Sequence, residues 1–458
     1  MNLQTIKRLP VVRTLYRLGW LVSAYHLTLA FLGALRYGFP SRKLVVIGVT
    51  GTKGKTTTCD LIAQILNAAG RETGLVTTVN FSTGDREWVN DTKQTMPGRF
   101  TLQRLLREMV RSGCTHAVVE TSSEGILQHR HRFISYRVAV FTNLSPEHIE
   151  RHGSFEAYRA AKVTLFERVA KRKDGVGVYN LDDENVGYFL APPVPVKYGY
   201  TRRAEDRGQR KEEGGKEIPN YKHQITNNFR ISNIKLTKKG TAFAFAGEKL
   251  EMPLVGEFNV ANAAAAICVA LSQGIPVGRI GAALRAAKPV PGRLELVNVG
   301  QRFTIIVDYA HEPASLAAVY EAARLFEPRR VIGLLGSQGG GRDVWKRAEM
   351  GKIAARNCDE IVLTNEDPYD EDPVRIINDI EKGIRVNPRF DQRRSASIHK
   401  TVDRREAIRT ALSLARPGDA VVLTGKGGEV WMCVAGGRKI PWDEKKTVEE
   451  EIKKLSGK

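Results

Sequence analysis

A glycine-rich loop between an apolar strand and a helix is the feature that most constrains this fold. Residues 43–51, KLVVIGVTG, form a continuous apolar run of the kind found in buried parallel strands. Residues 55–70, KTTTCDLIAQILNAAG, have the pattern of a helix that ends at a glycine. A strand, a glycine loop and a helix in this order offer backbone N–H groups and a helix N-terminus to phosphate oxygens. We therefore expect an α/β protein built around a nucleotide site.

The loop differs from the common P-loop pattern in its glycine positions. The spacing GxxxxGK[ST] requires glycine at the position of Val49, whereas the glycines stand at 48, 51 and 54. In the common pattern the lysine, here Lys55, reaches the outer phosphates, and the next hydroxyl, here Thr56, binds Mg²⁺. A chance GKT sequence is the alternative, and the position directly between a strand and a helix argues against it.

Strands that alternate with helical stretches continue along the chain and indicate a parallel sheet with ligands at the carboxyl ends of its strands. Residues 229–254 instead alternate polar and apolar side chains, which predicts an antiparallel hairpin region. The segment KPVPGRLE, at 288–295, has the composition of a linker. We expect an α/β fold with a P-loop-type central ATPase domain, followed by a Rossmann-like C-terminal α/β domain. The expected parts are a short helical segment (1–43), the central domain (44–290) and the C-terminal domain (291–458).

An apolar stretch with basic flanks lies near the N-terminus, at residues 19–35. It is shorter than the ~20 apolar residues that a spanning helix needs, and it contains His26. No small-residue cleavage site is evident, so we do not expect a signal peptide. The remaining interpretations are a helix packed on the body of the protein, which is slightly favoured, and a helix lying in a membrane interface. We expect a cytoplasmic protein, or one bound peripherally at the inner face of the membrane.

The formal net charge of +21 predicts an anionic partner, unless the excess Lys and Arg residues only cover the surface. Nucleic acid is not the expected partner, because RNA-binding surfaces interleave aromatic and basic residues. The richest basic stretch, RRAEDRGQRKEEGGK at 202–216, has no aromatic residue and contains acids. The five cysteines form no CxxC pair, which argues against zinc and redox motifs and is typical of a reducing cytoplasm.

The loop sequence TGTKGKTTT, at 50–58, resembles the ATP loop of the Mur ligase superfamily, where T-G-T-N-G-K-T-[ST] is typical. Lys53 stands at the position of the asparagine. The resemblance implies that ATP phosphorylates a carboxylate and that an amine attacks the acyl phosphate, giving an amide, ADP and phosphate. The residues that the resemblance assigns to ATP are Gly51, Thr52, Lys53, Gly54, Lys55, Thr56, Thr57, Asn259, Asn262, Arg293, Asp308 and His311.

The same resemblance implies two Mg²⁺ ions and a catalytic set that includes Lys55. Glu120, at the end of THAVVE, resembles the family's Mg²⁺ glutamate, and His148 its metal-binding histidine, although Glu147 replaces the usual Asp. Lys162 occupies the position of a lysine that family members carry as a carbamate, which turns a cation into an anionic oxygen ligand. Each residue alone has an ordinary structural explanation, but their order after a phosphate loop is a strong signal. The implied metal ligands are Thr56, Glu120, His148 and Lys162 as a carbamate.

Within the superfamily, the chain is most similar to the E-type branch, which adds the third amino acid to a UDP-muramoyl dipeptide. ETSSEGILQHR resembles the branch segment E-V-S-S-H-x-L-x-Q-x-R, and QTMPG resembles its T-T-P segment. GGGRDVWKRAEMG and TGKGGEVW resemble two further segments near the incoming amino acid. The resemblance implies an enzyme that binds a UDP-muramoyl peptide or related muropeptide and an amino acid, and we expect a monomer. The implied substrate contacts are Thr95, Met96, Ser122, Gln128, Arg130, Arg342, Glu366, Asp367, Tyr369, Gly425 and Glu429.

Two departures from the branch leave the substrates open. The diaminopimelate-adding enzymes carry D-N-P-R where this chain has EDPY, Glu366–Tyr369, and tyrosine cannot grip a carboxylate with two hydrogen bonds as arginine does. Lysine, ornithine or another diamine is therefore an alternative to diaminopimelate. The branch also carries a domain of roughly a hundred residues before the loop, whereas 43 residues precede Leu44 here. Either the apolar helix replaces that domain or the substrate differs, for example a lipid-linked muropeptide.

Three other functions compete with this interpretation. A polyglutamate or cyanophycin-type ligase shares the loop, but the segment from Ser122 to Arg130 favours a muropeptide. The lipid II amidating branch has a cysteine cluster that this sequence lacks. A non-catalytic nucleotide-binding protein would not need the whole set of Lys55, Glu120, His148 and Lys162.

Overall fold

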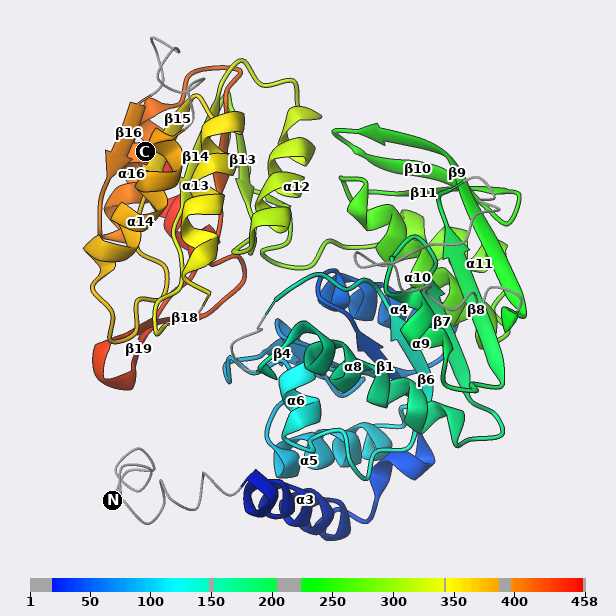
Figure 1. Cartoon of the computed structure of the whole chain (residues 1–458). Coiled ribbons are helices and arrows are strands. Elements are labelled where there is room, and N and C mark those ends of the chain that lie inside the picture. The colour runs from blue at the N-terminus through cyan, green and yellow to red at the C-terminus, as the bar shows by residue number, and fades with distance from the viewer. Residues whose placement is uncertain (1–18, 148–151, 204–223, 342, 387–396, 456–458) are drawn as a thin grey trace, which may run out of the picture. The chain divides into compact units, whose positions relative to one another are not determined.

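The computed structural model describes residues 19–147, 152–203, 224–341, 343–386 and 397–455 of the 458-residue chain (Figure 1). The chain divides into two compact units. The first unit comprises residues up to 144 together with 156–230 and 265–280, and the second comprises 145–155, 231–264 and 281–458. The predicted site residues His148 and Arg342 lie outside the described residues, as does most of the basic stretch 202–216.

The apolar strand predicted before the glycine loop lies in the middle of an 11-stranded sheet. β1 (Val45–Thr50) runs parallel to its two neighbours, β5 (His116–Glu120) and β6 (Tyr136–Phe141). Every β1 residue after Val45 is buried, as expected for a strand in a parallel sheet covered on both faces. The parallel part continues through β2 (Thr73–Val76), β7 (Val176–Asn180), β8 (Val196–Thr201) and the start of β9 (Asn227–Thr237).

Both edges of this sheet are antiparallel. At one edge β9 pairs with β10 (Gly240–Phe245) and β10 pairs with β11 (Glu248–Met252), which confirms the antiparallel region predicted at 229–254. At the other edge β3 (Asn80–Ser82) and β4 (Glu87–Val89) follow β2. The parallel order brings the carboxyl ends of β1, β5 and β6 to one edge, where ligands of α/β proteins bind.

Helices follow the strands as the sequence pattern predicts. α4 (Lys55–Ala68) begins directly after the glycine loop. α10 (Phe258–Ser272) is apolar nearly all round, and its alanines 263–266 are fully buried, as expected for a helix inside a core. Further helices are η1 (Pro40–Lys43), α5 (Arg99–Arg111), α6 (Ser123–Leu127), α8 (Phe155–Ala170), α9 (Val186–Leu190) and α11 (Val277–Arg285).

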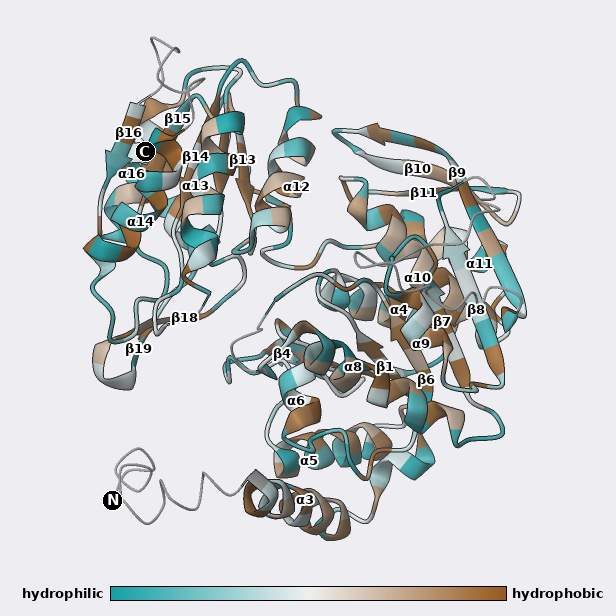
Figure 2. Cartoon of the chain, viewed as in Figure 1, coloured by the Kyte–Doolittle hydropathy of each residue, from teal (hydrophilic) through white to brown (hydrophobic). Residues whose placement is uncertain are grey.

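The apolar stretch near the N-terminus forms α3 (Gly19–Arg36), which is largely brown in the hydropathy colouring of Figure 2. It packs on the body of the first unit through small residues. Ala30 and Ala34 are buried, and a Cβ added to Gly33 would lie 3.3 Å from the carbonyl oxygen of Arg99 at the start of α5. In the part of the chain that the structure describes, no helix has both the length and the hydropathy needed to cross a membrane.

The second unit contains a six-stranded sheet. Its strands run parallel, except that β12 at one edge is antiparallel to β13. A hairpin of β18 (Trp431–Val434) and β19 (Arg438–Pro441) follows the last strand of this sheet. In order across the sheet, the strands are β12 (Glu295–Leu296), β13 (Thr304–Val307), β17 (Ala420–Leu423), β14 (Val331–Leu335), β15 (Glu360–Leu363) and β16 (Ser397–Lys400).

Alternating side chains of this sheet enter two separate cores, because successive residues of a strand point to opposite faces. On β14, Val331 and Leu335 belong to one core, and Ile332 and Leu334 belong to the other. The first core is closed by α12 (Pro313–Arg324), α13 (Trp345–Asn357) and α14 (Pro373–Arg385), and the second by α16 (Arg404–Leu414) and α17 (Glu444–Leu455). This confirms the α/β class, with a large, mainly parallel sheet followed by a second α/β domain.

Candidate active site

The glycine loop takes a conformation that only small residues allow. Gly51 has a φ of 150°, and a Cβ there would lie 2.0 Å from Thr142 Oγ1. Gly54 has a φ of 76° and is the residue before the first turn of α4. A left-handed glycine at this point turns the chain so that the first N–H groups of the helix are left for a ligand. The two glycines therefore allow the tight loop conformation that precedes the N-terminus of α4.

The end of β6 holds this loop through hydrogen bonds that the loop sequence does not reveal. Thr52 N donates to Asn143 O at 2.8 Å, and Lys53 N donates to Asn143 Oδ1 at 2.9 Å. The carbonyl of Lys53 in turn accepts from Thr142 Oγ1 at 2.8 Å and from Asn143 Nδ2 at 3.0 Å. The only sequence signal for this clamp is the polar Thr-Asn pair directly after the apolar strand at 136–141.

Two lysines meet at the carbonyl groups of the loop. Lys55 Nζ donates to Thr52 O at 2.7 Å, and Lys162 Nζ donates to Gly51 O at 2.6 Å. Lys162 comes from α8, is only 2% exposed, and lies with its Nζ 4.5 Å from the ring centroid of Tyr158. Tyr158 also reaches the loop, since its hydroxyl is 3.1 Å from Thr52 Oγ1. The structure thus brings both predicted lysines to one short segment of backbone.

Glu120 lies beside the first turn of α4. The pairing of Val49 with Glu120 places this carboxylate at the carboxyl end of β5. Its Oε2 accepts from Thr56 Oγ1 at 2.9 Å and from the backbone N of Thr78 at 2.9 Å. The Thr78 hydroxyl donates to Glu120 Oε1 at 3.1 Å and lies 3.0 Å from the Thr95 hydroxyl. Oxygen atoms gathered beside a phosphate loop are the ligand type that Mg²⁺ prefers, so Thr56 and Glu120 fit a magnesium site. Sequence reasoning missed Thr78.

A second group of metal-binding residue types occurs in the second unit, at Glu147, His311 and Glu312. Among the described residues, one ligand atom of each lies within 4.8 Å of the others. Burial lowers the pKa of His311 to about 3, which keeps its imidazole neutral. However, Lys346 Nζ lies 2.5 Å from Glu312 Oε1 and already satisfies that carboxylate. Fewer carboxylate oxygens of this group are therefore available to a metal ion than its residue types suggest.

Two predicted substrate residues of the first unit, Met96 and Gln128, contact a third, Arg130. Arg130 donates to Gln94 Oε1 at 2.7 Å, to Gln128 Oε1 at 2.7 Å and to the carbonyl of Met96. Burial lowers the pKa of this guanidinium. Met96 is only 1% exposed, so it offers its carbonyl and not its side chain. Ser122 caps α6 by accepting from Gly125 N at 3.1 Å, which gives it a structural role in any case.

The two predicted asparagines of α10 bond to each other. Asn259 Nδ2 donates to Val255 O at 2.8 Å, and Asn262 Nδ2 donates to Asn259 Oδ1 at 3.1 Å. Both side chains are buried. These contacts fix the start of α10, so a contribution to nucleotide binding would come in addition to this structural role.

Arg293, Asp308 and His311 lie together around Tyr309. The Arg293 guanidinium lies over the Tyr309 ring, 4.2 Å from its centroid, and His311 Nδ1 is 2.9 Å from Tyr309 O. Asp308 accepts from Leu294 N at 2.6 Å and from Ala310 N at 2.7 Å. Burial raises the pKa of the Asp308 carboxyl, and the nearby Arg293 opposes that shift. The sequence identified these three polar positions but not the Tyr309 ring that Arg293 and His311 contact.

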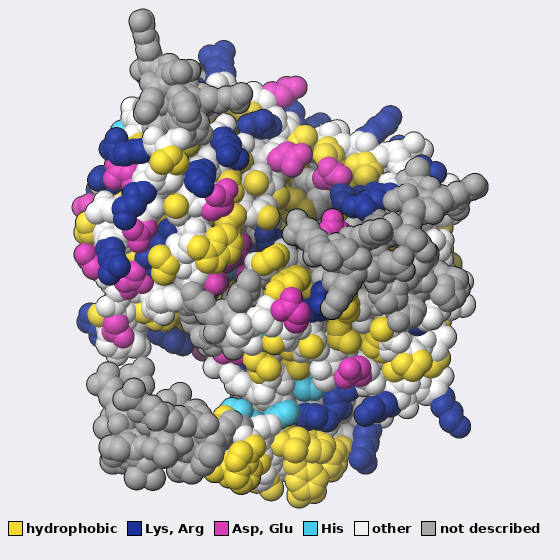
Figure 3. All heavy atoms as spheres, viewed as in Figure 1, with side chains coloured by type: hydrophobic (Ala, Val, Ile, Leu, Met, Phe, Trp, Pro, Cys, Tyr) yellow, Lys and Arg dark blue, Asp and Glu magenta, His cyan; other side chains and the backbone are white. Residues whose placement is uncertain are grey.

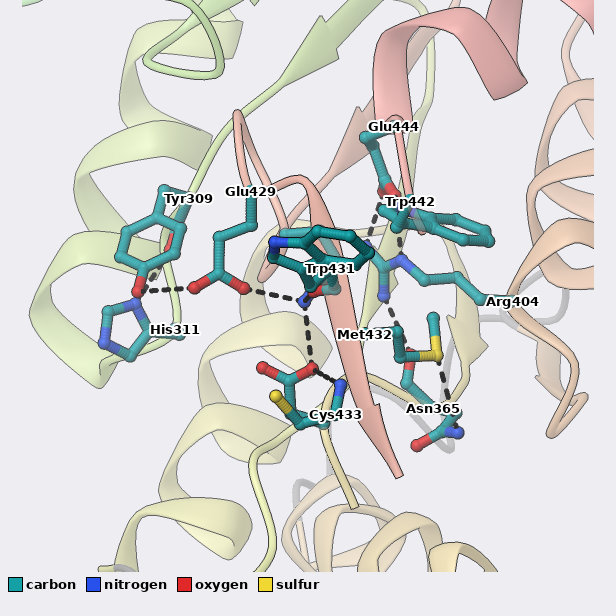
Figure 4. Close-up of polar contacts among 12 residues, drawn as sticks. Tyr309, His311, Asn365, Arg404, Glu429, Trp431, Met432, Cys433, Trp442 and Glu444 are labelled. Carbon is teal, nitrogen blue, oxygen red and sulfur yellow. Dashed lines mark hydrogen bonds and ion pairs between the residues drawn. The ribbon is translucent and has the colours of Figure 1, made fainter. Parts of the chain in front are cut away.

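Lys426 connects several acidic positions of the second unit. Figure 4 labels Tyr309, Glu429 and Cys433, which take part in the contacts described next. The fully buried Nζ of Lys426 donates to Asp367 Oδ1 at 3.0 Å and to Glu429 Oε2 at 2.6 Å. Asp367 also accepts from Cys433 N at 2.7 Å, and Glu429 Oε1 accepts from the Tyr309 hydroxyl at 3.3 Å. We call Glu366, Asp367, Glu429 and Lys426 the acidic cluster. Lys426 was missed, although it stands in the quoted TGKGGEVW segment.

Glu366 is the unusual member of the acidic cluster. It is fully buried, and neither carboxylate oxygen has a hydrogen-bond partner among the described residues. Burial raises its pKa to about 7, and the neighbouring Asp367 acts in the same direction. A Cβ at Gly425 would lie 2.4 Å from Glu366 Oε2, so the glycine leaves room for this side chain. Tyr369 is tied to the β18 hairpin by its N–H, which donates to Cys433 O at 3.2 Å.

Comparisons with known proteins agree with this geometry. Residues 49–270 match the Mur ligase middle domain, and residues 292–427 match the Mur ligase glutamate ligase domain. A UDP-N-acetylmuramyl-tripeptide synthetase of Roseiflexus sp. (strain RS-1) is 37% identical over 431 residues, covering 91% of this chain and 80% of that protein. A UDP-N-acetylmuramoyl-L-alanyl-D-glutamate–2,6-diaminopimelate ligase of Geobacillus kaustophilus (strain HTA426) is 37% identical over 447 residues, covering 94% and 84%.

Solved structures show the same relationship. A UDP-N-acetylmuramoyl-L-alanyl-D-glutamate–2,6-diaminopimelate ligase superposes with a TM-score of 0.59 at 29% identity, covering 90% of this chain and 79% of that one. A folylpolyglutamate synthase of Mycobacterium tuberculosis, solved with ADP and AMPPCP, gives a TM-score of 0.66 at 19% identity and shares the fold. Two matching domains and long relatives above a third identity leave one conclusion: this chain belongs to the Mur ligase family of ATP-dependent acid–amino-acid ligases.

Proposed function

We propose that this chain joins an amino acid, a diamino acid such as lysine or ornithine, to a muramoyl-peptide precursor in peptidoglycan synthesis. The observation that carries the proposal is the convergence of Lys55, Lys162, Thr56 and Glu120 on one glycine loop. The printed names of the two relatives above support the substrate class, since both act on UDP-muramoyl peptides. The proposal includes a cytoplasmic, monomeric enzyme, and five buried free cysteines accord with a reducing compartment.

In this proposal the first turn of α4 and Lys55 hold the phosphates of ATP. Backbone N–H groups at a helix N-terminus and a lysine ammonium are complementary to phosphate oxygens. Thr56 and Glu120 would hold magnesium together with His148. Bound Mg²⁺ would neutralise phosphate charge while the terminal phosphoryl group passes to the substrate carboxylate. Asn259, Asn262, Arg293, Asp308 and His311 are the further residues proposed for the nucleotide, with residues 44–290 and 291–458 as the two working domains.

A carbamate on Lys162 fits the contacts of this side chain. Its Nζ uses one proton to donate to Gly51 O, and a carbamate nitrogen would keep one N–H for the same bond. The carbamate would add two oxygens that share one negative charge beside the loop, and it would remove a buried positive charge. Lys162 would then complete the oxygen set begun by Thr56 and Glu120.

The muropeptide is proposed to bind at Arg130, whose fork suits a carboxylate or phosphate of the substrate. Gln128 and the carbonyl of Met96 accept hydrogen bonds from Arg130. Thr95 and Ser122, which bond to Thr78 and Gly125, are the further residues proposed for this substrate. These contacts show how Arg130 is oriented in the free protein, with its donors shared among neutral acceptors that an anion would outcompete.

The acidic cluster is proposed to receive the incoming amino acid, and Arg342, Gly425 and Tyr369 are the further residues proposed for this substrate. The buried Glu366 carboxylate has no partner among the described residues, and a distal ammonium would supply one. Tyr369 offers a hydroxyl and a ring, and neither can hold a distal carboxylate as an arginine would. A diamino acid without a distal carboxylate, such as lysine or ornithine, therefore fits these residues better than diaminopimelate does.

Phosphate release separates these choices. Purified chain, ATP, Mg²⁺ and bicarbonate would be combined with UDP-muramoyl dipeptide and with lysine, ornithine or diaminopimelate in turn. We expect ADP and tripeptide to form together with lysine or ornithine. Turnover with diaminopimelate but with neither lysine nor ornithine would refute the proposal that lysine or ornithine is the amino acid added. ADP formation without any amide product would refute the ligase assignment for this substrate class.

A further inference from the structure

α3 presents its large apolar side chains to solvent and its small ones to the protein. Ala30, Gly33 and Ala34 face α5, as described above. On the opposite side, Trp20 is 68% exposed, Leu35 is 56% exposed and Leu32 is 44% exposed, and Tyr25 and Phe31 are exposed as well. A helix that only packs on a soluble protein does the reverse and buries its largest apolar residues. A contiguous apolar patch of this kind marks an interaction site.

A positively charged cavity adjoins the C-terminal end of this helix. It has a volume of about 530 Å³ and is lined by Leu35, Tyr37 and Gly38, by the acidic Glu108 and by four arginines, Arg36, Arg104, Arg107 and Arg111. Arg104 makes a long ion pair of 3.8 Å with Glu108, which is the one acidic residue of the lining. The lining is therefore cationic, and Leu35 belongs both to the cavity and to the apolar face.

Figure 3 shows the apolar patch over α3 at the lower edge of the view, with Lys and Arg side chains beside it. An apolar face bordered by cationic groups is complementary to the boundary between acyl chains and anionic headgroups. α3 does not have the length and hydropathy of a spanning helix, so it would lie along this boundary. The formal net charge of +21 acts in the same direction.

We propose that α3 and the arginine-lined cavity form a docking surface for a lipid bilayer that contains anionic phospholipids. Trp20, Phe31, Leu32 and Leu35 enter the acyl boundary, and the cavity receives a lipid phosphate. This surface is distinct from the glycine loop and the acidic cluster, and the inference goes beyond the proposed ligase activity.

The test is co-sedimentation of the full-length chain with vesicles. We expect binding to vesicles of phosphatidylglycerol and phosphatidylcholine, little binding to phosphatidylcholine alone, and weakening of the binding by salt. The double variant Leu32→Glu, Leu35→Glu should bind at least about tenfold more weakly, because two apolar side chains no longer leave water. Arg107→Gln with Arg111→Gln should also weaken binding by about tenfold or more, through the loss of two cations near the headgroups.

Matched variants at other exposed positions test whether the loss of vesicle binding comes from this surface or only from the change in the protein's net charge. Leu455→Glu on α17, at 47% exposure, introduces an acid at a similarly exposed leucine far along the chain. Arg279→Gln with Arg285→Gln removes two exposed arginines of α11. Both controls should bind like the wild-type chain. Trp20→Phe should retain binding but lose most of the blue shift of tryptophan fluorescence on vesicle addition.

The proposal is overturned by a wild-type chain that ignores anionic vesicles, or by test variants that bind no differently from the controls. A dimer in light scattering that Leu32→Glu, Leu35→Glu converts to a monomer, without vesicle binding, would assign the face to a second copy of the chain. Phosphate release with soluble substrates should be unchanged in both test variants. A loss of docking is thereby distinguished from a failure of the ligase proposal.

Discussion

The glycine loop of the first unit and the acidic cluster of the second unit differ in whether their charged side chains have hydrogen-bond partners. In the loop, the lysines and Glu120 are engaged by carbonyls, hydroxyls and backbone N–H groups. In the acidic cluster, Lys426 satisfies Asp367 and Glu429 but leaves Glu366 buried without a partner among the described residues. A site whose charged groups all have hydrogen-bond partners is ordered before its ligand binds. A buried carboxylate without a partner keeps an unfavourable desolvation free energy, which a cationic ligand can offset. The loop therefore suits a reactant common to the whole family, and the acidic cluster suits the one that varies.

The strongest way to break this comparison is at Lys162. Lys162→Ala should lower turnover by about 1000-fold, because a charged group preorganised at a reacting phosphate carries a large share of the rate. Short carboxylates added to the assay should restore part of the activity by supplying the oxygens of the carbamate. Phosphate release with and without acetate or formate measures both effects.

A second buried lysine provides the control for this experiment. Lys197 is 3% exposed and donates to Leu190 O at 2.8 Å and to Gln224 Oε1 at 2.7 Å, in the same unit as Lys162. Lys197→Ala should reduce stability without any response to carboxylates. Equal rescue of both variants, or no rescue of a folded Lys162→Ala, would contradict the carbamate assignment.

The rigidity of the loop is tested at Gly51. Gly51→Ala places a Cβ 2.0 Å from Thr142 Oγ1, so the clamp formed by the end of β6 has to move. A displacement of about 1 Å at a reacting group costs roughly 100-fold in rate, and we expect turnover to fall by that amount with little change in amino-acid KM. Gly70→Ala is the matched control, since it also has a positive φ but nothing within 4 Å of the added Cβ. A Gly51→Ala enzyme as active as Gly70→Ala would show that the loop is not held as tightly as its hydrogen bonds suggest.

The acidic cluster is tested at Glu366, whose pKa is raised from 4.5 to about 7 by burial. Between these values the native state binds the proton and the unfolded state does not. The stabilising contribution is therefore present below pH 4.5 and is lost as the pH rises to about 7. Glu366→Gln keeps a neutral group at every pH, so at pH 8 it should be more stable than the wild-type chain by roughly 3 kcal/mol. The same variant should raise the KM for the diamine by about tenfold, through loss of a charged partner.

Urea unfolding at pH 5 and pH 8 and phosphate-release kinetics measure these two effects. Glu349→Gln, at a half-exposed glutamate paired with Lys352, serves as the control and should show neither change. If Glu366→Gln is destabilised at pH 8 to the same extent as at pH 5, the carboxylate has a partner in solution and the contrast with the loop disappears.

The sequence predicted most of the fold because its signals are local. Alternation of apolar strands with helical stretches gave the α/β class, and the polar–apolar alternation at 229–254 gave the antiparallel edge. The position of the loop between β1 and α4 followed from the order of strand, glycine and lysine. The small-residue face of α3 was not foreseen, because an all-apolar helix gives no indication of which side is buried.

The contacts within the candidate site were less predictable than its motifs. Thr78, Asn143 and Tyr158 reach the loop or Glu120 from segments distant in sequence, and only the sheet order brings them there. Lys426 stood inside a quoted motif with two of its acceptors, Glu429 and the carbonyl of Trp431, but only the tertiary fold brings the third acceptor, Asp367, to it. The orphaned state of Glu366 depends on what surrounds it on every side, which spacing along a chain does not encode.

The smallest expected effect concerns the choice of amino acid, which the acidic cluster is proposed to receive. Tyr369 has a φ of 53°, so the backbone already accepts a strained position, and its ring packs 3.5 Å from a Cβ built on Gly340. Tyr369→Arg restores the guanidinium of the D-N-P-R motif and should raise kcat/KM for diaminopimelate relative to lysine by about tenfold, the value of one charge-assisted pair. Tyr369→Phe, which removes only the hydroxyl, should leave the ratio unchanged. The arginine variant could shift the kcat/KM ratio of diaminopimelate to lysine no further than the phenylalanine variant does. Selectivity would then come from Glu366 and its neighbours, and the glycine loop and the acidic cluster would differ only in how their charges are paired.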